Sequence, residues 1–291
     1  MSVDDLFSVA SFGDNYNVMK KYRATRIPEI VMWIREYAVK NDIENLIIGI
    51  SGGIDSSVTS TLCTLTGLPT TVMMMPIVNS PPLAMKHAHW LHDHYDNVTS
   101  VVTDLTSVYD SFVECTSDND ELALANARAR IRMMRLYHEA STRNGIVVGT
   151  GNKVEDFGVG FFTKYGDGGV DISPIADCMK TEVWAMGKAL SIEKDIIDAP
   201  PTDGLWADGR TDEDQLGMDY EEIEEAMYID RCPDGEGLVE VTDNMRLNVE
   251  KYRKLRAKSL HKMNPIPVCT ATFKDDNIKL SAYSNLKAWA E

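Results

Sequence analysis

Short apolar segments that alternate with stretches of helical periodicity run through the first half of the chain. They are NLIIGI, TTVMMMPI, NVTSVVTDL and GIVVGTGN, at residues 45–50, 70–77, 97–105 and 145–152. Strands that are apolar on both faces are typical of parallel sheets covered by helices on both sides. The pattern therefore predicts an α/β fold, a doubly wound parallel sheet with helices on both faces and right-handed crossovers.

Helices are expected between and after these strands. In residues 26–40 the apolar side chains of Ile27, Ile30, Ile34 and Ala38 recur at helical spacing. Further helices are expected at residues 56–66, 80–95 and 120–143, near YEEIEEAMYI (220–229), and from about 239 to 262. Ligands of such folds gather at the carboxyl ends of the strands, where two glycine-rich turns lie in this sequence. We therefore expect the functional site at that edge of the sheet.

The composition limits the class of protein. With 291 residues, 44% of them hydrophobic, the chain can form one large domain or two small ones. The 45 acidic residues outnumber the 29 basic ones, and the formal charge of −16 disfavours a general nucleic-acid-binding surface. The first residues lack the pattern of a secretory signal, and no apolar run approaches the roughly 20 residues that span a bilayer. We expect a soluble, cytoplasmic protein that binds neither nucleic acid nor membrane.

Cysteine and histidine give no metal signature. The five cysteines are scattered without a CxxC pair, which indicates neither a zinc site nor a disulfide framework. The histidines of the expected helix 80–95 have no cysteine or carboxylate at ligand spacing, so zinc is not expected there. These histidines are His87, His89, His92 and His94.

The segment SGGIDSS, residues 51–57, turns sharply out of the first strand into a helix. Gly52 and Gly53 let the backbone turn tightly and approach a ligand closely. The free amides at the start of the next helix favour an anion such as phosphate. Asp55 would repel a phosphate unless a divalent cation such as Mg²⁺ lay between them. The Walker pattern GK[ST] is missing, so this predicts a phosphate site of another kind.

This heptad resembles the SGGxDSS loop of ATP pyrophosphatases, which cleave ATP between its α- and β-phosphates. A longer stretch, GTGNKVEDFGVGFFTKYGDGGVDISPIADCMKTEV, closely resembles the ammonia-dependent NAD synthetases, ligases that amidate deamido-NAD. The resemblance extends to NARARIRM (126–133), PPTDGLW (200–206), RTDEDQLG (210–217) and LHKMNPIP (260–267). It implies an adenine-nucleotide alpha-hydrolase-like, Rossmann-like fold over a single domain, 1–291, without a glutaminase domain.

The resemblance also implies a role for individual residues. ATP would be bound by Gly49, Ile50, Ser51, Gly52, Gly53, Ile54, Asp55 and Ser56, and by Thr150, Lys180 and Thr202. Magnesium would be bound by Asp55 and Glu155, and Asp55 and Lys180 would be catalytic. Deamido-NAD would be held by Arg130, Lys164, Asp171, His261 and Lys262. The chain is expected to form a homodimer, with the deamido-NAD site across the interface.

Two details of this assignment stay open. The interval from Glu155 to Lys164 is one residue longer than in the commonest members of the family, so Glu155 or its neighbour Asp156 could face the metal. Arg128 and Arg132 share a helix face, whereas Arg130 points elsewhere. One of these two faces is expected to be structural.

The expected reaction proceeds in two steps. The nicotinate carboxylate of deamido-NAD attacks the α-phosphorus of ATP, and ammonia then attacks the acyl-adenylate to give NAD and AMP. The segment 202–217 is the candidate lid. An alternative is another ATP pyrophosphatase, such as a tRNA-modifying adenylating enzyme, which the acidic charge and scattered cysteines disfavour. A second is a non-catalytic nucleotide sensor, which the intact Asp55, Glu155 and Lys180 disfavour.

Overall fold

A parallel sheet of four strands forms the centre of the computed structural model, which describes residues 26–78, 82–117, 120–202, 211–231 and 241–269. The strands are β1 (Asn45–Gly49), β2 (Thr70–Met74), β3 (Val98–Val102) and β4 (Gly145–Val147), in the order β3-β2-β1-β4. All pairs are parallel, with Ile48 opposite Val72 and Leu46 opposite Ile146. The predicted parallel sheet is confirmed, although each strand is shorter than its apolar segment.

One face of the sheet is covered by helices from both halves of the chain. These are α3 (Ile27–Lys40), α4 (Ile54–Leu65), α5 (Pro82–His94), α8 (Lys180–Ala189) and α9 (Lys194–Ile197). Leu46 and Ile48 of β1 pack into this layer with Ile34 and Leu62, and all four are fully buried. The amphipathic pattern of residues 26–40 therefore produces a helix whose apolar side lies against the sheet.

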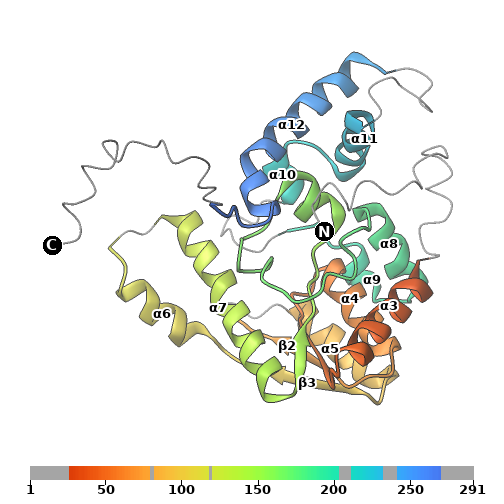
Figure 1. Cartoon of the computed structure of the whole chain (residues 1–291), viewed down its shortest axis with the longest axis vertical. Coiled ribbons are helices and arrows are strands. Elements are labelled where there is room, and N and C mark those ends of the chain that lie inside the picture. The colour runs from red at the N-terminus through yellow and green to blue at the C-terminus, as the bar shows by residue number, and fades with distance from the viewer. Residues whose placement is uncertain (1–25, 79–81, 118–119, 203–210, 232–240, 270–291) are drawn as a thin grey trace, which may run out of the picture.

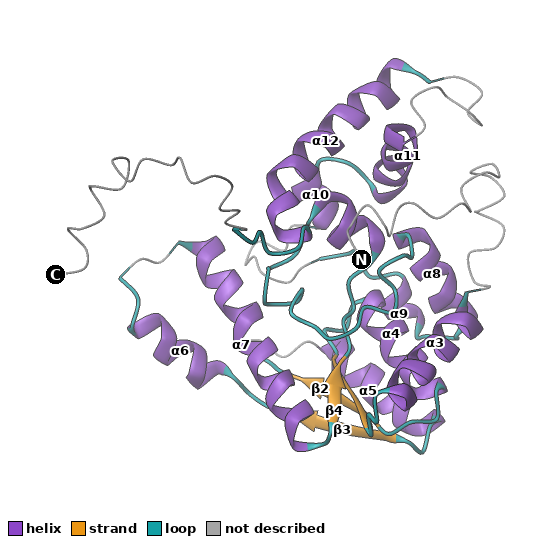
Figure 2. Cartoon of the chain, in the orientation of Figure 1, coloured by secondary structure: helices purple, strands orange, loops and turns teal. Residues whose placement is uncertain are grey.

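The opposite face is covered by α6 (Thr106–Glu114) and the long α7 (Glu121–Thr142). Ile47, between the two β1 residues just named, points to this side and packs with Met73, Tyr109 and Ile131. Successive strand residues point to opposite faces, so both faces of β1 are buried. Figure 2 shows the strands between the two groups of helices, as a doubly wound sheet requires.

A third hydrophobic cluster lies beyond the sheet. It is built by α10 (Asp212–Leu216), α11 (Tyr220–Arg231), α12 (Asp243–Met263) and a π-helix, η1 (Lys153–Val159), that follows β4. In Figure 1 these helices stand above the sheet, with α11 beside α12. Gly160 lies so close to α12 that an added Cβ would come within 2.3 Å of the Cβ of Ser259. This packing fixes η1, which carries site residues.

The sequence predicted some helices and missed others. The expected helices at 26–40, 56–66, 80–95, 120–143, near 220–229 and at 239–262 correspond to α3, α4, α5, α7, α11 and α12. The helices α6, α8, α9 and α10 and the π-helix η1 were not predicted. Part of the candidate lid, residues 203–210, lies outside the described residues. Within the described residues, no helix combines the length and the apolar character needed to cross a membrane.

Candidate active site

The turn between β1 and α4 is built by its own hydroxyl groups. The Ser51 backbone NH donates to Ser56 Oγ at 3.2 Å, and Ser56 Oγ donates to the Gly53 carbonyl at 3.0 Å. The Gly53 NH donates to Ser51 Oγ at 3.2 Å. Gly49 closes β1, Ile50 is buried, and Gly53 caps α4, whose first residues are Ile54 and Asp55. The local sequence therefore forms a closed turn at the amino end of α4, which favours a bound anion.

Gly52 is required in this turn for two reasons. Its φ of 91° lies in the left-handed region that other residues rarely adopt. A Cβ added there would stand 2.7 Å from the backbone nitrogen of Ala84. The turn is thus held against α5.

Three charged side chains from three separate elements meet beside this turn. Lys180 Nζ, from the start of α8, lies 2.5 Å from Asp55 Oδ2 and 2.8 Å from Glu155 Oε1. The side chains are 3%, 17% and 15% exposed, for Lys180, Asp55 and Glu155 respectively. These three residues are here called the site cluster. Because their side chains are largely buried, their charges have little contact with water.

Burial and the ion pairs together set the pKa values of the site cluster. Burial raises the pKa of Asp55, although Lys180 opposes the rise. Burial acts the same way on Glu155, but Lys180 and two hydrogen bonds outweigh it and lower the pKa of that carboxyl. Burial alone would lower the pKa of Lys180, yet the two carboxyl groups raise it above its ordinary value. Lys180 therefore stays an ammonium ion at neutral pH.

Two further side chains, which the sequence did not single out, donate hydrogen bonds to the carboxylates of the site cluster. Asn152 Nδ2 donates to Asp55 Oδ1 at 3.0 Å, while its Oδ1 accepts from the backbone NH groups of Val154 and Glu155. The Tyr220 hydroxyl, from α11, donates to Glu155 Oε1 at 2.5 Å. Asn152 ends the GTGN turn, which directly follows a predicted strand. Its position at the carboxyl end of that strand could have marked it as a candidate site residue. No local pattern marked Tyr220.

Glu155, and not Asp156, shares the Lys180 ammonium with Asp55. Asp156 lies against the turn after β4, where its Oδ2 would stand 1.8 Å from a Cβ added to Gly151. Burial raises the pKa of Asp156 well above its ordinary value, with added repulsion from Asp167. The π-helix has i→i+5 hydrogen bonds and so holds more residues per turn than an α-helix. Both Glu155 and Asp156 lie in this π-helix, Lys153–Val159.

A second group of expected residues gathers around residues 160–171. Arg130 Nε donates to the Lys164 carbonyl at 3.3 Å, and Lys164 Nζ donates to the His261 carbonyl at 2.8 Å. Lys262 Nζ donates to the carbonyls of Gly160 and Phe162. These contacts bring the end of α12 to α7.

Asp171 contacts none of these groups in the hydrogen bonds just given. Its carboxylate instead accepts hydrogen bonds from a backbone NH group and from a tyrosine hydroxyl. Its Oδ2 accepts from the Val147 NH at 2.8 Å, and its Oδ1 accepts from the Tyr137 hydroxyl at 3.0 Å. Arg128 and Arg132 donate to the Tyr109 hydroxyl and the Met75 carbonyl, whereas Arg130 faces Lys164. Arg128 and Arg132 thus bond on one side of α7 and Arg130 on another, and which face is structural stays a prediction.

Thr150 and Thr202 are less closely tied to the site cluster. Thr150 is half-buried in the turn that follows β4, next to Gly151 and Asn152. Thr202 is exposed and directly precedes the segment outside the described residues. The turn places Thr150 at the same sheet edge as Asp55.

The donors of the site cluster suit a hard divalent cation. Within the described residues there is no set of three or more His, Cys, Asp or Glu side chains that could hold a metal. Asp55 and Glu155 nevertheless converge on one point, now contacted by the Lys180 ammonium. Magnesium commonly takes one or two carboxylates and completes its shell with water and phosphate oxygens. The two carboxylates fit that pattern.

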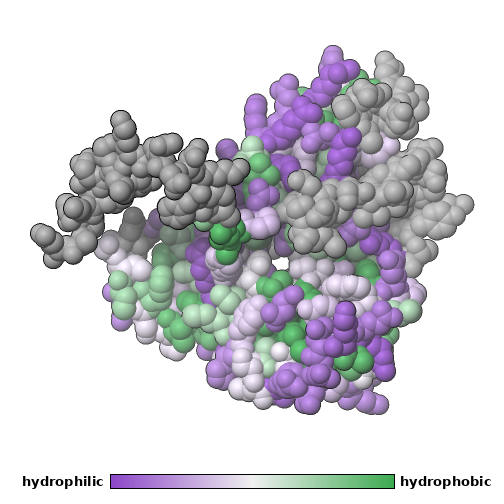
Figure 3. Space-filling model, viewed as in Figure 1, coloured by the Kyte–Doolittle hydropathy of each residue, from purple (hydrophilic) through white to green (hydrophobic). Residues whose placement is uncertain are grey.

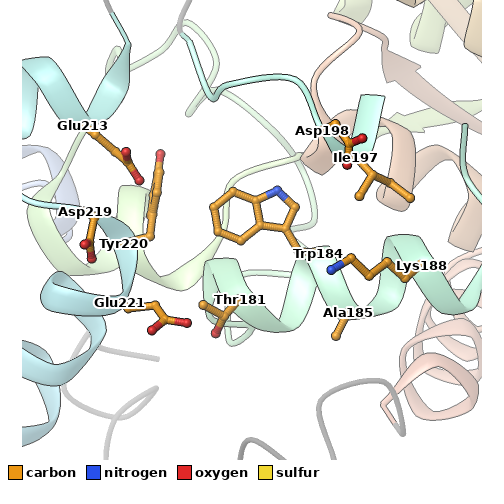
Figure 4. A pocket seen from close by; sticks show the side chains of 10 residues that line it. All are labelled: Thr181, Trp184, Ala185, Lys188, Ile197, Asp198, Glu213, Asp219, Tyr220 and Glu221. Carbon is orange, nitrogen blue, oxygen red and sulfur yellow. The ribbon is translucent and has the colours of Figure 1, made fainter. Parts of the chain in front are cut away.

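An open cleft of about 630 Å³ lies along α8, next to the site cluster. Figure 4 shows the Trp184 indole in the middle of it, with the Tyr220 ring nearby and acidic side chains around them. Tyr220 is thus shared between the cleft and the site cluster.

Comparison with known proteins agrees with this geometry. The profile of the NAD synthase family matches residues 26–266. The NH(3)-dependent NAD(+) synthetase of Sulfurisphaera tokodaii is 35% identical over 246 residues, covering 81% of this chain and 85% of that protein. The enzyme of the same name from Sulfolobus acidocaldarius is 39% identical over 202 residues, 69% of this chain and 72% of the relative.

Solved structures share the fold. The NMN synthetase of Francisella tularensis is 33% identical, with a TM-score of 0.73 over 86% of this chain and 99% of the other. The NH3-dependent NAD synthetase of Campylobacter jejuni, at 22% identity, has a TM-score of 0.70 over 85% of this chain and 99% of the other, which shows the fold alone. With the sheet, the phosphate turn and the profile match in agreement, the chain belongs to the NAD synthase family.

Proposed function

We propose that this protein is an ammonia-dependent NAD synthetase that converts deamido-NAD, ATP and ammonia into NAD, AMP and pyrophosphate. The observation that carries the proposal is the site cluster, in which Lys180, Asp55 and Glu155 meet beside the SGGIDSS turn. The family match and the names of the curated relatives support the choice of reaction.

The turn and Lys180 would serve the first step. The residues from Gly49 to Ser56 bind the phosphates of ATP through backbone NH groups and hydroxyls, with Thr150 and Thr202 as further contacts. Lys180, held as an ammonium ion, stabilises the charge that develops as pyrophosphate leaves the α-phosphorus. Asp55 and Glu155 hold Mg²⁺, which screens the phosphate charges when bound. Most of the rate enhancement would come from positioning and electrostatics, because no side chain forms a covalent bond.

The second group of residues would hold deamido-NAD. Its phosphates and its carboxylate are anions, and the guanidinium of Arg130 and the ammonium groups of Lys164 and Lys262 offer matching charges. His261 and Asp171 complete the expected set. The contacts between α7, residues 160–171 and the end of α12 support a common site for Arg130, Lys164, His261 and Lys262.

We further propose a homodimer in which α6 and α7 meet the partner. Large apolar side chains are exposed on these helices: Val108 47%, Phe112 42%, Leu122 55% and Met134 57%. Figure 3 shows hydrophobic residues gathered over this part of the surface. Arg130 lies on the same helix as Met134, so the interface would adjoin the deamido-NAD site. Sedimentation should give a dimer, and a fully active monomer would refute this arrangement.

The assay for the reaction uses purified protein with ATP, Mg²⁺, deamido-NAD and ammonium. NAD and AMP should form in equal amounts, and release of ADP would refute the mechanism. Ammonium should support the reaction directly, because the curated relatives are named NH(3)-dependent NAD(+) synthetases. Asp55→Ala should abolish NAD formation. His92→Ala, on the exposed side of α5, is the matched control.

A second candidate is amidation of the mononucleotide to give NMN. It is favoured by the 33% identity with the NMN synthetase of Francisella tularensis. The same assay with nicotinate mononucleotide in place of deamido-NAD separates the two. We expect the larger kcat/KM with deamido-NAD, and the reverse order would assign the protein to NMN synthesis.

A further inference from the structure

Tyr220 lies at the meeting point of the site cluster and the helices beyond the sheet. It begins α11 and is 1% exposed. Its hydroxyl lies 2.5 Å from Glu155 Oε1 and 3.2 Å from Asp212 Oδ2. The hydroxyl carries one proton, and the shorter contact indicates that Glu155 receives it.

The ring of Tyr220 is also engaged. Lys180 Nζ lies 5.0 Å from the ring centroid, within the range of a cation–π contact. The Trp184 ring meets the Tyr220 ring edge-on, at 5.6 Å and 88° between planes. Tyr220 thus contacts one carboxylate and the cation of the site cluster while its other side faces the cleft of Figure 4.

These contacts restrict Glu155 more than Lys180 alone could. Glu155 Oε1 accepts from both Lys180 Nζ and the Tyr220 hydroxyl. Two donors from different elements leave this oxygen one favourable position. A carboxylate held by an outer hydrogen bond binds a metal more tightly, because less freedom is lost on binding.

We propose that Tyr220 is a positioning residue, whose hydroxyl fixes Glu155 and whose ring fixes Lys180, so that the site cluster is prepared for magnesium and ATP. This rests on the proposed function for its substrates, but the residue itself belongs to neither expected binding set. It acts through Glu155 and Lys180 and does not touch the reacting atoms.

The test compares Tyr220→Phe with Tyr228→Phe. Each removes one hydroxyl from a buried tyrosine of α11, but Tyr228 is two turns away from the site cluster. Binding of α,β-methylene-ATP is measured by calorimetry as a function of magnesium concentration, and NAD formation is measured in parallel. In Tyr220→Phe the magnesium concentration for half-maximal binding and for half-maximal rate should rise about 10- to 100-fold. The KM for deamido-NAD should stay within twofold, and Tyr228→Phe should behave as wild type.

A double variant separates positioning from a general structural effect. If Tyr220 acts through Glu155, adding Tyr220→Phe to Glu155→Gln should change the magnesium requirement of binding by less than about threefold. An equal effect in both backgrounds would overturn the proposal, as would an unchanged magnesium requirement in Tyr220→Phe alone. If wild type binds the analogue but makes neither NAD nor NMN, the proposed function fails, while the binding measurement still decides the role of Tyr220.

Discussion

Two buried polar groups sit on the same helix α4 and differ in what they can do. The site cluster uses Asp55 at the start of α4, together with Glu155 and Lys180. One turn further along, Ser60 Oγ lies 3.1 Å from His87 Nε2, and His87 Nδ1 lies 3.0 Å from Glu193 Oε2. The second group, here called the His87 cluster, has the serine–histidine–carboxylate order of a hydrolase.

The two clusters differ in where they lie in the fold and in how deeply they are buried. Ser60 and His87 are both 0% exposed and lie among the apolar side chains between α4, α5 and α9. The site cluster lies at the carboxyl edge of the sheet, next to a turn with free backbone NH groups. It also contains two carboxylates, Asp55 and Glu155, whereas the His87 cluster contains one. Hydrogen-bonded titratable groups therefore indicate a site only where a ligand can reach them.

The largest expected effect comes from the cation of the site cluster. Lys180→Met keeps an unbranched chain but removes the charge that we propose stabilises departing pyrophosphate. The rate of NAD formation, kcat, should fall about 10²- to 10³-fold. Steady-state assays at saturating substrates measure this, with circular dichroism to check folding. A variant that keeps a tenth of the wild-type kcat would remove Lys180 from the chemistry.

Gly52→Ala should disturb the site cluster and leave the His87 cluster in place. The left-handed φ and the clash with the Ala84 backbone should together lower the free energy of unfolding by about 2–4 kcal/mol. Nucleotide binding should weaken more than stability alone explains, because the turn supplies phosphate contacts. Urea unfolding and calorimetry measure the two effects. Gly217→Ala is the control, since it has a similar φ of 68° but nothing within 4 Å of an added Cβ.

His87→Leu should disturb the His87 cluster and leave the site cluster in place. It leaves the Ser60 hydroxyl and the Glu193 carboxylate without their imidazole partner, which should cost about 1–3 kcal/mol of unfolding free energy. The kcat of the folded fraction should stay within twofold of wild type. Urea unfolding combined with the NAD assay checks both statements. A hundredfold loss of kcat without a loss of stability would contradict a purely structural His87 cluster.

The smallest expected effect is the pH dependence of the His87 cluster. Burial would raise the pKa of Glu193, but the hydrogen bond from His87, a backbone hydrogen bond and the charge of Lys86 together outweigh it and lower that pKa. A carboxyl whose pKa is lower in the folded state stabilises the fold above its unfolded pKa, and the contribution is lost as the pH falls through the folded value. Solvent screening limits it to less than about 1 kcal/mol. Urea midpoints of wild type and Glu193→Gln should therefore differ at pH 7 and converge below about pH 4.

Much of the sheet was predictable because its signals are local. The central strand β1 and its neighbour β2 are buried along most of their length, which favours apolar runs, whereas the edge strand β3 has only Val98 buried. The helix α6 was missed, and so was α8, which begins at Lys180. Short helices depend on tertiary packing more than on their own propensity, so their sequences carry weak signals.

The site was predictable in part. Asp55 was marked by the turn, whereas Glu155 and Lys180 came from the family resemblance, and the structure brings all three together. Asn152 and Tyr220 were not assigned, although they hold the two carboxylates. The roles expected for ATP, magnesium and deamido-NAD remain predictions until a ligand is bound.

By itself, the sequence determined the alternation of strands and helices and the tight glycine turn between β1 and α4. Both follow from neighbouring residues, through side-chain alternation in strands and the backbone freedom of glycine. Only the tertiary structure decided that Glu155 rather than Asp156 shares Lys180 with Asp55, and that the Tyr220 hydroxyl donates to Glu155. Those contacts include pairs 65 and 125 positions apart, Tyr220 with Glu155 and Lys180 with Asp55. Their partners are chosen by the packing of η1, α8 and α11, which no local pattern encodes.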